Sequence, residues 1–215
     1  MISNNSLPQF TSRVIPVVAL DSPDQVLPLG HALLEGGVDV IEVTLRTSAG
    51  LPAISLLRHA LPQIVVTAGS ILSPQDLNAA HNAGAVAAFS PGITADLLAA
   101  GAASTIPLIP GIATPSELMQ AMAYGYQLVK FFPAETFGGL GALNALTGPF
   151  AGIRFCPTGG VNSVNLADYL RHPGVVFVGG TWIAPLRLVR DQRWEEITRL
   201  AREATEIVRG VEETR

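Results

Sequence analysis

The chain has 215 residues, of which 48% are hydrophobic and only 14% are charged, and its formal net charge is −4. A mildly acidic chain of this kind can bury a large core, and it has no general attraction to nucleic acid or to an anionic membrane. The single cysteine, Cys156, excludes an intrachain disulfide and a cysteine-rich metal site. Residues 1–11 do not resemble a signal peptide, and no stretch reaches the roughly 18 apolar residues of a transmembrane helix, so we expect a cytoplasmic protein.

Short apolar runs alternate along the chain with longer segments rich in alanine and leucine. The runs predict eight strands, at Val14–Ala19, Val38–Leu45, Ile64–Thr67, Ala87–Ser90, Pro107–Ile109, Leu128–Phe132, Gly152–Phe155 and Val175–Val178. The segments predict helices, several with Ser-Pro or Thr-Pro start signals, at Ser22–Glu35, Leu51–Ala60, Pro74–Ala83, Thr94–Ala102, Thr114–Tyr124, Leu140–Leu146, Val164–His172 and Trp194–Arg209.

This alternation predicts an α/β fold with a parallel sheet that is covered by helices. Eight repeats at this spacing favour a (β/α)8 TIM barrel over an open sheet. No linker, charge block or low-complexity tract divides the chain, so we expect a single domain over residues 1–215, with residues 1–12 as a short N-terminal extension. In such a barrel the chemistry lies at the C-terminal ends of the strands.

Lys130 is the only lysine in the chain, and it lies in the apolar run Leu128–Phe132. An ammonium group is costly to remove from water, whereas the neutral amine is a nucleophile that can form a Schiff base with a keto substrate. The alternative is a lysine at a strand end whose side chain extends to water. These residues alone leave the two interpretations about equal.

The second predicted strand carries Glu42 and Arg46 on the same face, because side chains alternate along a strand. The opposite face is apolar and must pack under the helices, so Glu42 and Arg46 point into the barrel mouth. One alternative is an ion pair that merely plugs the barrel. Residues four apart on a strand lie roughly 13 Å apart at Cα, so that pair requires Arg46 to fold back.

Glycine pairs follow the last two predicted strands, at Gly159-Gly160 and Gly179-Gly180, each beside a threonine. Barrel enzymes commonly bind phosphate at these two positions through exposed backbone N–H groups. The alternative is a pair of turns that need positive φ angles. The four histidines fall on or beside predicted helices, so no metal site is assigned, and Cys156 is interpreted as a small buried apolar residue.

Six motifs occur in order along the chain, and together they resemble the 2-keto-3-deoxy-6-phosphogluconate (KDPG) aldolase and 4-hydroxy-2-oxoglutarate (KHG) aldolase family. They are Glu42-Val-Thr-Leu-Arg46, Ser90-Pro-Gly92, Ile109-Pro-Gly111, Lys130-Phe-Phe-Pro-Ala-Glu135, Cys156-Pro-Thr-Gly-Gly160 and Gly179-Gly-Thr-Trp182. The resemblance extends from about Arg13 to Pro185. It implies a class I aldolase on a β/α barrel, usually trimeric, that splits KDPG into pyruvate and glyceraldehyde 3-phosphate in the Entner-Doudoroff pathway.

The resemblance also implies a role for individual residues. Lys130 corresponds to the Schiff-base lysine, Glu42 to the general acid and base, and Arg46 to the partner of the substrate carboxylate. Ser70 corresponds to a substrate-binding position at the pyruvate site, where the family usually has threonine. The other matched positions are the pocket-lining Pro91 and Thr158 and the phosphate-binding Gly159, Gly160, Gly180 and Thr181. Serine is more frequent than threonine at the Thr181 position, and the Thr-Leu-Arg of the first motif favours the gluconate over the galactonate substrate.

The expected partner is a small keto-acid phosphate, with no cofactor, no metal, no nucleic acid and no membrane, and the expected assembly is a homotrimer. The first rival is an aldolase that acts mainly on 4-hydroxy-2-oxoglutarate and gives pyruvate and glyoxylate. The second is a non-catalytic barrel that binds a phosphosugar or a protein partner. The presence of Lys130, Glu42 and Arg46 together argues against the second.

Overall fold

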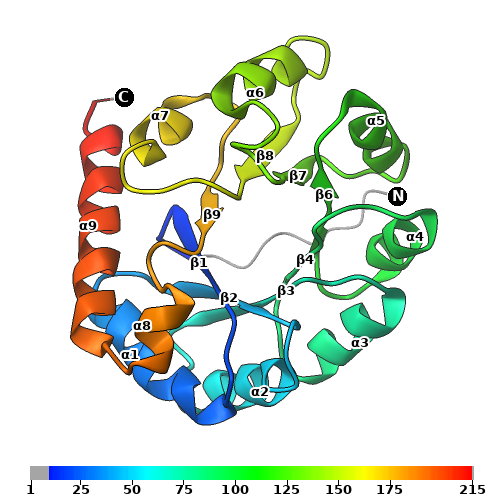
Figure 1. The fold of residues 1–215 in the computed structure, drawn as a ribbon. Coiled ribbons are helices and arrows are strands. Elements are labelled where there is room, and N and C mark those ends of the chain that lie inside the picture. Colours follow the sequence, from blue (N-terminus) through cyan, green and yellow to red (C-terminus); the bar gives the residue numbers. More distant parts are fainter. Residues whose placement is uncertain (1–9, 215) are drawn as a thin grey trace.

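The computed structural model describes residues 10–214, and short strands in its centre are surrounded by helices (Figure 1). The strands are β1 (Val14–Val18), β2 (Val40–Thr44), β3 (Val65–Gly69), β4 (Ala88–Phe89), β5 (Leu108–Ile109), β6 (Gly111–Ile112), β7 (Leu128–Phe131), β8 (Arg154–Pro157) and β9 (Val178–Gly180). Every strand pair among the described residues is parallel. The predicted α/β alternation is therefore confirmed.

The strands form two sheets. The first is a curled six-stranded sheet with the order β5-β4-β3-β2-β1-β9, and the second has the order β6-β7-β8. Pro110 alone separates β5 from β6, and an isolated parallel bridge between Thr158 and Gly179 links the end of β8 to β9. Pro110 and this isolated bridge are thus links between the two sheets, and the strands are arranged around one centre (Figure 1).

Helices cover the outside of the strands (Figure 1). They are the 3-10 helix η1 (Pro23–Gln25) and the α-helices α1 (Val26–Glu35), α2 (Gly50–Ala60), α3 (Pro74–Asn82), α4 (Ala95–Ala103), α5 (Pro115–Ala123), α6 (Gly139–Thr147), α7 (Leu166–Arg171), α8 (Leu186–Arg190) and α9 (Trp194–Glu212). Two predicted start signals cap their helices, because Ser73 and Thr114 accept hydrogen bonds from the backbone of the first turns of α3 and α5. Thr94 caps α4 in the same way.

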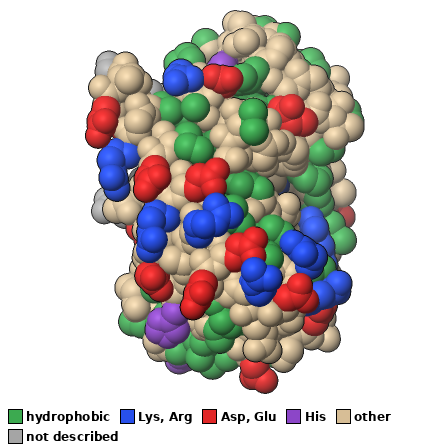
Figure 2. Space-filling view, turned by 60° about the vertical axis from the view of Figure 1, so that its left-hand side comes forward, with side chains coloured by type: hydrophobic (Ala, Val, Ile, Leu, Met, Phe, Trp, Pro, Cys, Tyr) green, Lys and Arg blue, Asp and Glu red, His purple; other side chains and the backbone are tan. Residues whose placement is uncertain are grey.

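Helix α9 shows how one apolar stripe fixes a helix to the rest of the protein. Its buried residues Ile197, Ala201, Ala204, Val208 and Val211 recur at a spacing of three or four, and they face α1 and α7. Its opposite side carries arginines and glutamates of alternating charge, which Figure 2 shows as mixed blue and red groups on this face. This face therefore has no large patch of a single charge.

Strand β9 differs from the prediction, because it begins three residues later and includes Gly179 and Gly180. Pairing with Ile15 and Pro16 of β1 overrides the low strand preference of glycine. The missing side chains also allow a close approach, since a methyl group on Gly179 would lie 2.5 Å from the Oγ1 of Thr158. The short helix α8 was not predicted.

Asp39, directly before β2, binds the first described residues of the chain through hydrogen bonds. Its two carboxylate oxygens accept hydrogen bonds from the backbone and hydroxyl groups of Thr11 and Ser12, at 2.6–2.9 Å. Residues 1–9 of the predicted N-terminal extension lie outside the described residues. Within residues 10–214, no helix is long and apolar enough to cross a membrane.

Candidate active site

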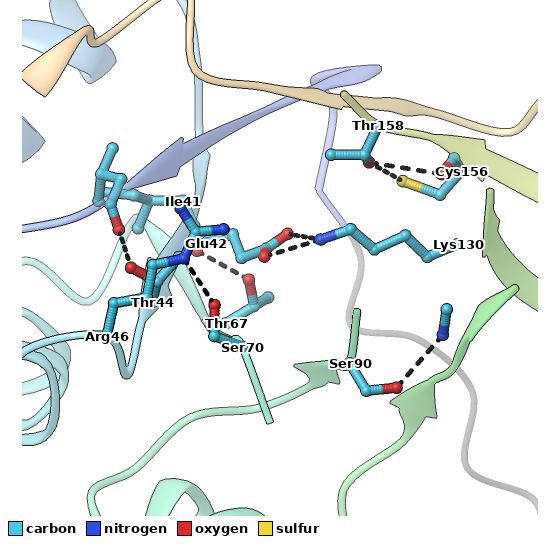
Figure 3. Close-up of polar contacts among 12 residues, drawn as sticks. Ile41, Glu42, Thr44, Arg46, Thr67, Ser70, Ser90, Lys130, Cys156 and Thr158 are labelled. Atoms are coloured by element: carbon cyan, nitrogen blue, oxygen red, sulfur yellow. Dashed lines mark hydrogen bonds and ion pairs between the residues drawn. The ribbon is translucent and has the colours of Figure 1, made fainter. Parts of the chain in front are cut away.

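The side chains of Lys130 on β7 and Glu42 on β2 meet between the two sheets (Figure 3). The Lys130 Nζ donates hydrogen bonds to both carboxylate oxygens of Glu42, at 3.0 and 3.3 Å. Lys130 is 5% exposed and Glu42 is 1% exposed. The alternative in which the amine extends to water is therefore wrong.

Strand alternation explains why these two side chains point inward. Val129 and Phe131, the neighbours of Lys130, are fully buried members of the hydrophobic core, and so are Ile41 and Val43, the neighbours of Glu42. The glycine at the end of β3 makes room for the carboxylate, because a methyl group on Gly69 would lie 2.1 Å from the Oε1 of Glu42. The ion pair thus depends on the register of three strands.

Two aromatic rings flank the amine, and neither was singled out from the sequence. The ring centroids of Phe89 and Phe132 each lie 5.4 Å from the Lys130 Nζ. Both rings stabilise a cation through their negative faces while keeping the surroundings poor in water. Phe132 shares the inward face with Lys130 because it lies two residues later, so strand alternation contained this signal, whereas nothing in the sequence pointed to Phe89.

Arg46 does not fold back onto Glu42 and instead bonds to Ser70 on the neighbouring segment (Figure 3). The Arg46 Nε donates to the Ser70 Oγ at 3.0 Å, and the Arg46 side chain is exposed. The alternative of a Glu42–Arg46 plug is therefore wrong. Ser70 has a φ of 59°, the left-handed region that few residues other than glycine adopt. The backbone thereby carries the Ser70 hydroxyl to the guanidinium.

Thr158 and Cys156 lie at the end of β8, beside Lys130 of the adjacent strand. The Thr158 Oγ1 and the Cys156 Sγ are 3.7 Å apart, and both side chains are buried. Burial raises the pKa of the Cys156 thiol to about 12, although the Lys130 charge opposes this shift. The thiol is therefore protonated at neutral pH, and Cys156 behaves as the small buried residue that the sequence predicted.

The other predicted site residues lie on the loops that follow the strands. Half-buried Pro91 follows β4, and its carbonyl group approaches Gly111 closely, since a methyl group there would lie 2.5 Å from the Pro91 oxygen. Gly159 and Gly160 follow β8 with φ angles of 97° and 83°, as the turn alternative expects, whereas Gly179 and Gly180 lie in β9 without a positive φ. Gly180 ends β9, where a methyl group would collide with the Trp182 ring, and exposed Thr181 follows it.

Metal ligands do not gather in the part of the chain that the structure describes. No three His, Cys, Asp or Glu side chains within residues 10–214 come close enough to hold a metal ion. The four histidines lie on helices or at a helix end, on α1, α2, α3 and directly after α7.

What the site brings together is an amine, a carboxylate and an exposed guanidinium. Such a set can form an imine, move a proton and bind a carboxylate.

Comparisons with known proteins extend these observations. A sequence model of the family "KDPG and KHG aldolase" matches residues 8–200. The "KHG/KDPG aldolase" of Escherichia coli is 47% identical over 196 residues, which covers 91% of this chain and 92% of the relative.

Two solved structures share the fold. A KDPG aldolase from Legionella pneumophila, with pyruvate captured as a covalent carbinolamine intermediate, has a TM-score of 0.88 and 44% identity, covering 90% of this chain and 94% of its own. A KDPG aldolase from Zymomonas mobilis with 3-phosphoglycerate has a TM-score of 0.84 and 39% identity, covering 90% of each chain. The chain therefore belongs to the KDPG and KHG aldolase family.

Proposed function

We propose that this chain is a class I aldolase that cleaves KDPG to pyruvate and glyceraldehyde 3-phosphate, with Lys130 as the Schiff-base residue. The observation that carries the proposal is the buried contact of 3.0 Å between the Lys130 Nζ and the Glu42 Oε1. Membership of the aldolase family and the covalent pyruvate in the Legionella relative support it. The intact amine and carboxylate also argue against a non-catalytic barrel.

The reaction begins with the transfer of a proton from the Lys130 ammonium to Glu42, which leaves a neutral amine beside a neutral acid. The amine adds to the C2 ketone and gives a carbinolamine. Glu42, at hydrogen-bond distance, returns the proton to the C2 oxygen, so that water leaves and an iminium ion forms. The iminium withdraws electrons from the adjacent C3–C4 bond.

Cleavage requires a base at the C4 hydroxyl. Glu42, directly or through a water molecule, removes this proton, the C3–C4 bond breaks, and the aldehyde leaves while the electron pair forms an enamine on C3. Glu42 then protonates C3, and hydrolysis releases pyruvate and free Lys130. Positioned proton transfer of this kind typically contributes ~10²–10⁴-fold to the rate. No metal is needed in this sequence, since the iminium is the electron sink.

Substrate binding is assigned to both ends of the keto acid. Arg46, whose Nε is held by Ser70, binds the carboxylate through its other guanidinium nitrogens. The positive-φ pair Gly159-Gly160 and the segment Gly180-Thr181 bind the phosphate with backbone N–H groups. Pro91 and Thr158 line the pocket between them. The phosphorylated ligand of the Zymomonas relative supports a phosphate site in this family.

A second substrate is favoured by the Escherichia coli relative, whose name includes KHG aldolase. 4-Hydroxy-2-oxoglutarate offers the same 2-keto acid to Lys130 and Arg46 but has no phosphate. The same residues can therefore cleave it to pyruvate and glyoxylate. The test divides kcat/KM for KDPG by kcat/KM for 4-hydroxy-2-oxoglutarate. A ratio far above one supports KDPG as the main substrate, whereas a ratio below one makes 4-hydroxy-2-oxoglutarate the main substrate.

The architecture in the proposal is a single (β/α)8 barrel over residues 1–215, in which β5 and β6 count as one strand. The continuity through Pro110 and the Thr158–Gly179 bridge support closure. We further propose a cytoplasmic homotrimer, as in the family that the sequence resembles. Light scattering on the purified chain tests the assembly, and a mass of one or two subunits would contradict it.

The decisive experiment is reductive trapping. Incubation with pyruvate and borohydride should leave one reduced adduct on Lys130, located by peptide mass spectrometry. Lys130→Met, which keeps an unbranched side chain one atom shorter and removes the amine, should give no adduct and no cleavage. An unmodified Lys130 under conditions that retain full activity would refute the Schiff-base mechanism.

A further inference from the structure

A buried tyrosine and a glutamate form a contact that the proposed reaction does not use. Tyr169 on α7 is fully buried, and its hydroxyl donates a hydrogen bond of 2.5 Å to the Oε1 of Glu135. Glu135 lies on the turn after β7, five residues after Lys130. Burial and the hydrogen bond to the Glu135 carboxylate raise the pKa of Tyr169, so the hydroxyl is a donor at neutral pH.

The backbone of this turn is bound to the loop that carries the proposed phosphate glycines. The Ala134 N–H donates to the Thr158 carbonyl at 2.8 Å, and the Glu135 N–H donates to the Gly159 carbonyl at 3.0 Å. A shift of Glu135 would therefore be transmitted directly to the loop after β8.

The Glu135 side chain has two ends that face different neighbours. Its methylene groups cover Gly160, because a methyl group on Gly160 would lie 2.5 Å from the Glu135 Cβ and 2.6 Å from its Cγ. Its carboxylate points away from Gly160 and lies next to Gly139 at the start of α6. A methyl group on Gly139 would lie 3.0 Å from the Glu135 Oε1 and 3.3 Å from the Tyr169 oxygen. The carboxylate is thus drawn to α7.

We propose that Tyr169 is a positioning residue for substrate selection: its hydroxyl holds the Glu135 carboxylate against α7 and away from an anion bound at Gly159-Gly160. The inference rests on the proposed function, because it takes these glycines to bind the substrate phosphate. A carboxylate released next to a phosphate repels it, because two negative charges at close range repel each other even where water reaches them. Phosphorylated keto acids are affected, whereas unphosphorylated ones are not.

The test is Tyr169→Phe in the full chain, which removes the hydroxyl and leaves the ring. The KM for KDPG should rise about fivefold, the effect of repulsion between two unit charges about 4 Å apart in water, while kcat stays within about twofold. The kcat/KM for 4-hydroxy-2-oxoglutarate should stay within about twofold as well. Inhibition of that second reaction by inorganic phosphate should weaken in parallel.

Two further variants separate this role from a purely structural one. Glu135→Gln keeps an acceptor for Tyr169 but carries no charge, so adding it to Tyr169→Phe should restore the KM for KDPG. Tyr126→Phe is the matched control, because its hydroxyl also bonds inside the protein, to the Leu98 carbonyl at 2.9 Å, but on a different side of the molecule from the loop. It should change neither substrate's KM.

Several results would overturn the inference. Equal losses for both substrates in Tyr169→Phe would indicate a structural role, and unchanged kinetics or a double variant without rescue would exclude the charge argument. A wild-type protein that traps pyruvate but shows neither preference for KDPG nor inhibition by phosphate would refute the phosphate assignment itself, and this inference with it. Normal selectivity in the wild type that persists unchanged in Tyr169→Phe would refute this inference alone.

Discussion

Gly69→Ala tests the geometry of the active site without replacing any residue that takes part in the reaction. The added methyl group would lie 2.1 Å from the Glu42 Oε1, 2.7 Å from its Cγ and 2.8 Å from its Cδ. Gly69 does not have a positive φ, so alanine is compatible with its backbone, and the carboxylate is what must move. Restoring an ordinary contact requires a shift of about 1 Å. Glu42 is 1% exposed, so there is little room for this shift.

The expected effect on activity is large, because a displacement of about 1 Å in a catalytic group can cost about 10²-fold in rate. Overpacking should also lower the free energy of unfolding by about 1–3 kcal/mol. Pyruvate release, coupled to lactate dehydrogenase, measures the first quantity, and thermal or urea unfolding measures the second. The prediction is a kcat/KM lowered about 10²-fold in a protein that still folds.

Gly141→Ala is the matched control, because Gly141 is exposed on α6 and a methyl group there would meet no atom within 4 Å. It should leave the activity unchanged and raise stability by at most about 1 kcal/mol, the gain in helix preference. If Gly69→Ala retains wild-type kcat/KM, the Glu42 carboxylate does not act from the position between β3 and Lys130, and the assigned geometry of catalysis is wrong.

Two further variants address proton transfer and the fastening of the N-terminal segment. Glu42→Gln should still form the trapped adduct on Lys130, although more slowly, while turnover falls ~10²–10⁴-fold, and unchanged turnover would remove Glu42 from the mechanism. Asp39→Asn should lower the free energy of unfolding at neutral pH by about 1–2 kcal/mol, since part of Asp39 is exposed. Burial alone would raise the pKa of Asp39, but hydrogen bonds from Ser12 and Thr11 bring it below its ordinary value. Its stabilisation is therefore complete above about pH 4, the ordinary carboxyl range, and is lost as the pH falls further, so unfolding curves of the two proteins should converge in acid. A difference that persists unchanged to pH 2 would contradict the role of the Asp39 charge.

The sequence was sufficient to predict features that depend on neighbours along the chain. Alternation in Val38–Leu45 placed Glu42 on the inward face of its strand, because the opposite face is apolar. Helix starts at Ser73 and Thr114 followed from capping signals that act within one turn. These features need no knowledge of the rest of the fold.

Contacts between distant segments could not be predicted in the same way. The partner of Glu42 is 88 residues away on β7, and the sequence alone left open a pairing with Arg46. Glu135 had no evident partner, because Tyr169 is brought to it by the packing of α7. Strand β9 was placed too early, since Gly179 is in a strand only through pairing with β1, at the other end of the chain.

Because Lys130 is the only lysine, proteolysis can measure how much of the protein carries a modified Lys130. A protease that cuts only after unmodified lysine should divide the unfolded chain into residues 1–130 and 131–215, because no other lysine is present. A reduced pyruvate adduct blocks that cut. The proportion of uncut chain on a gel then reports directly what fraction of the molecules had carried the substrate.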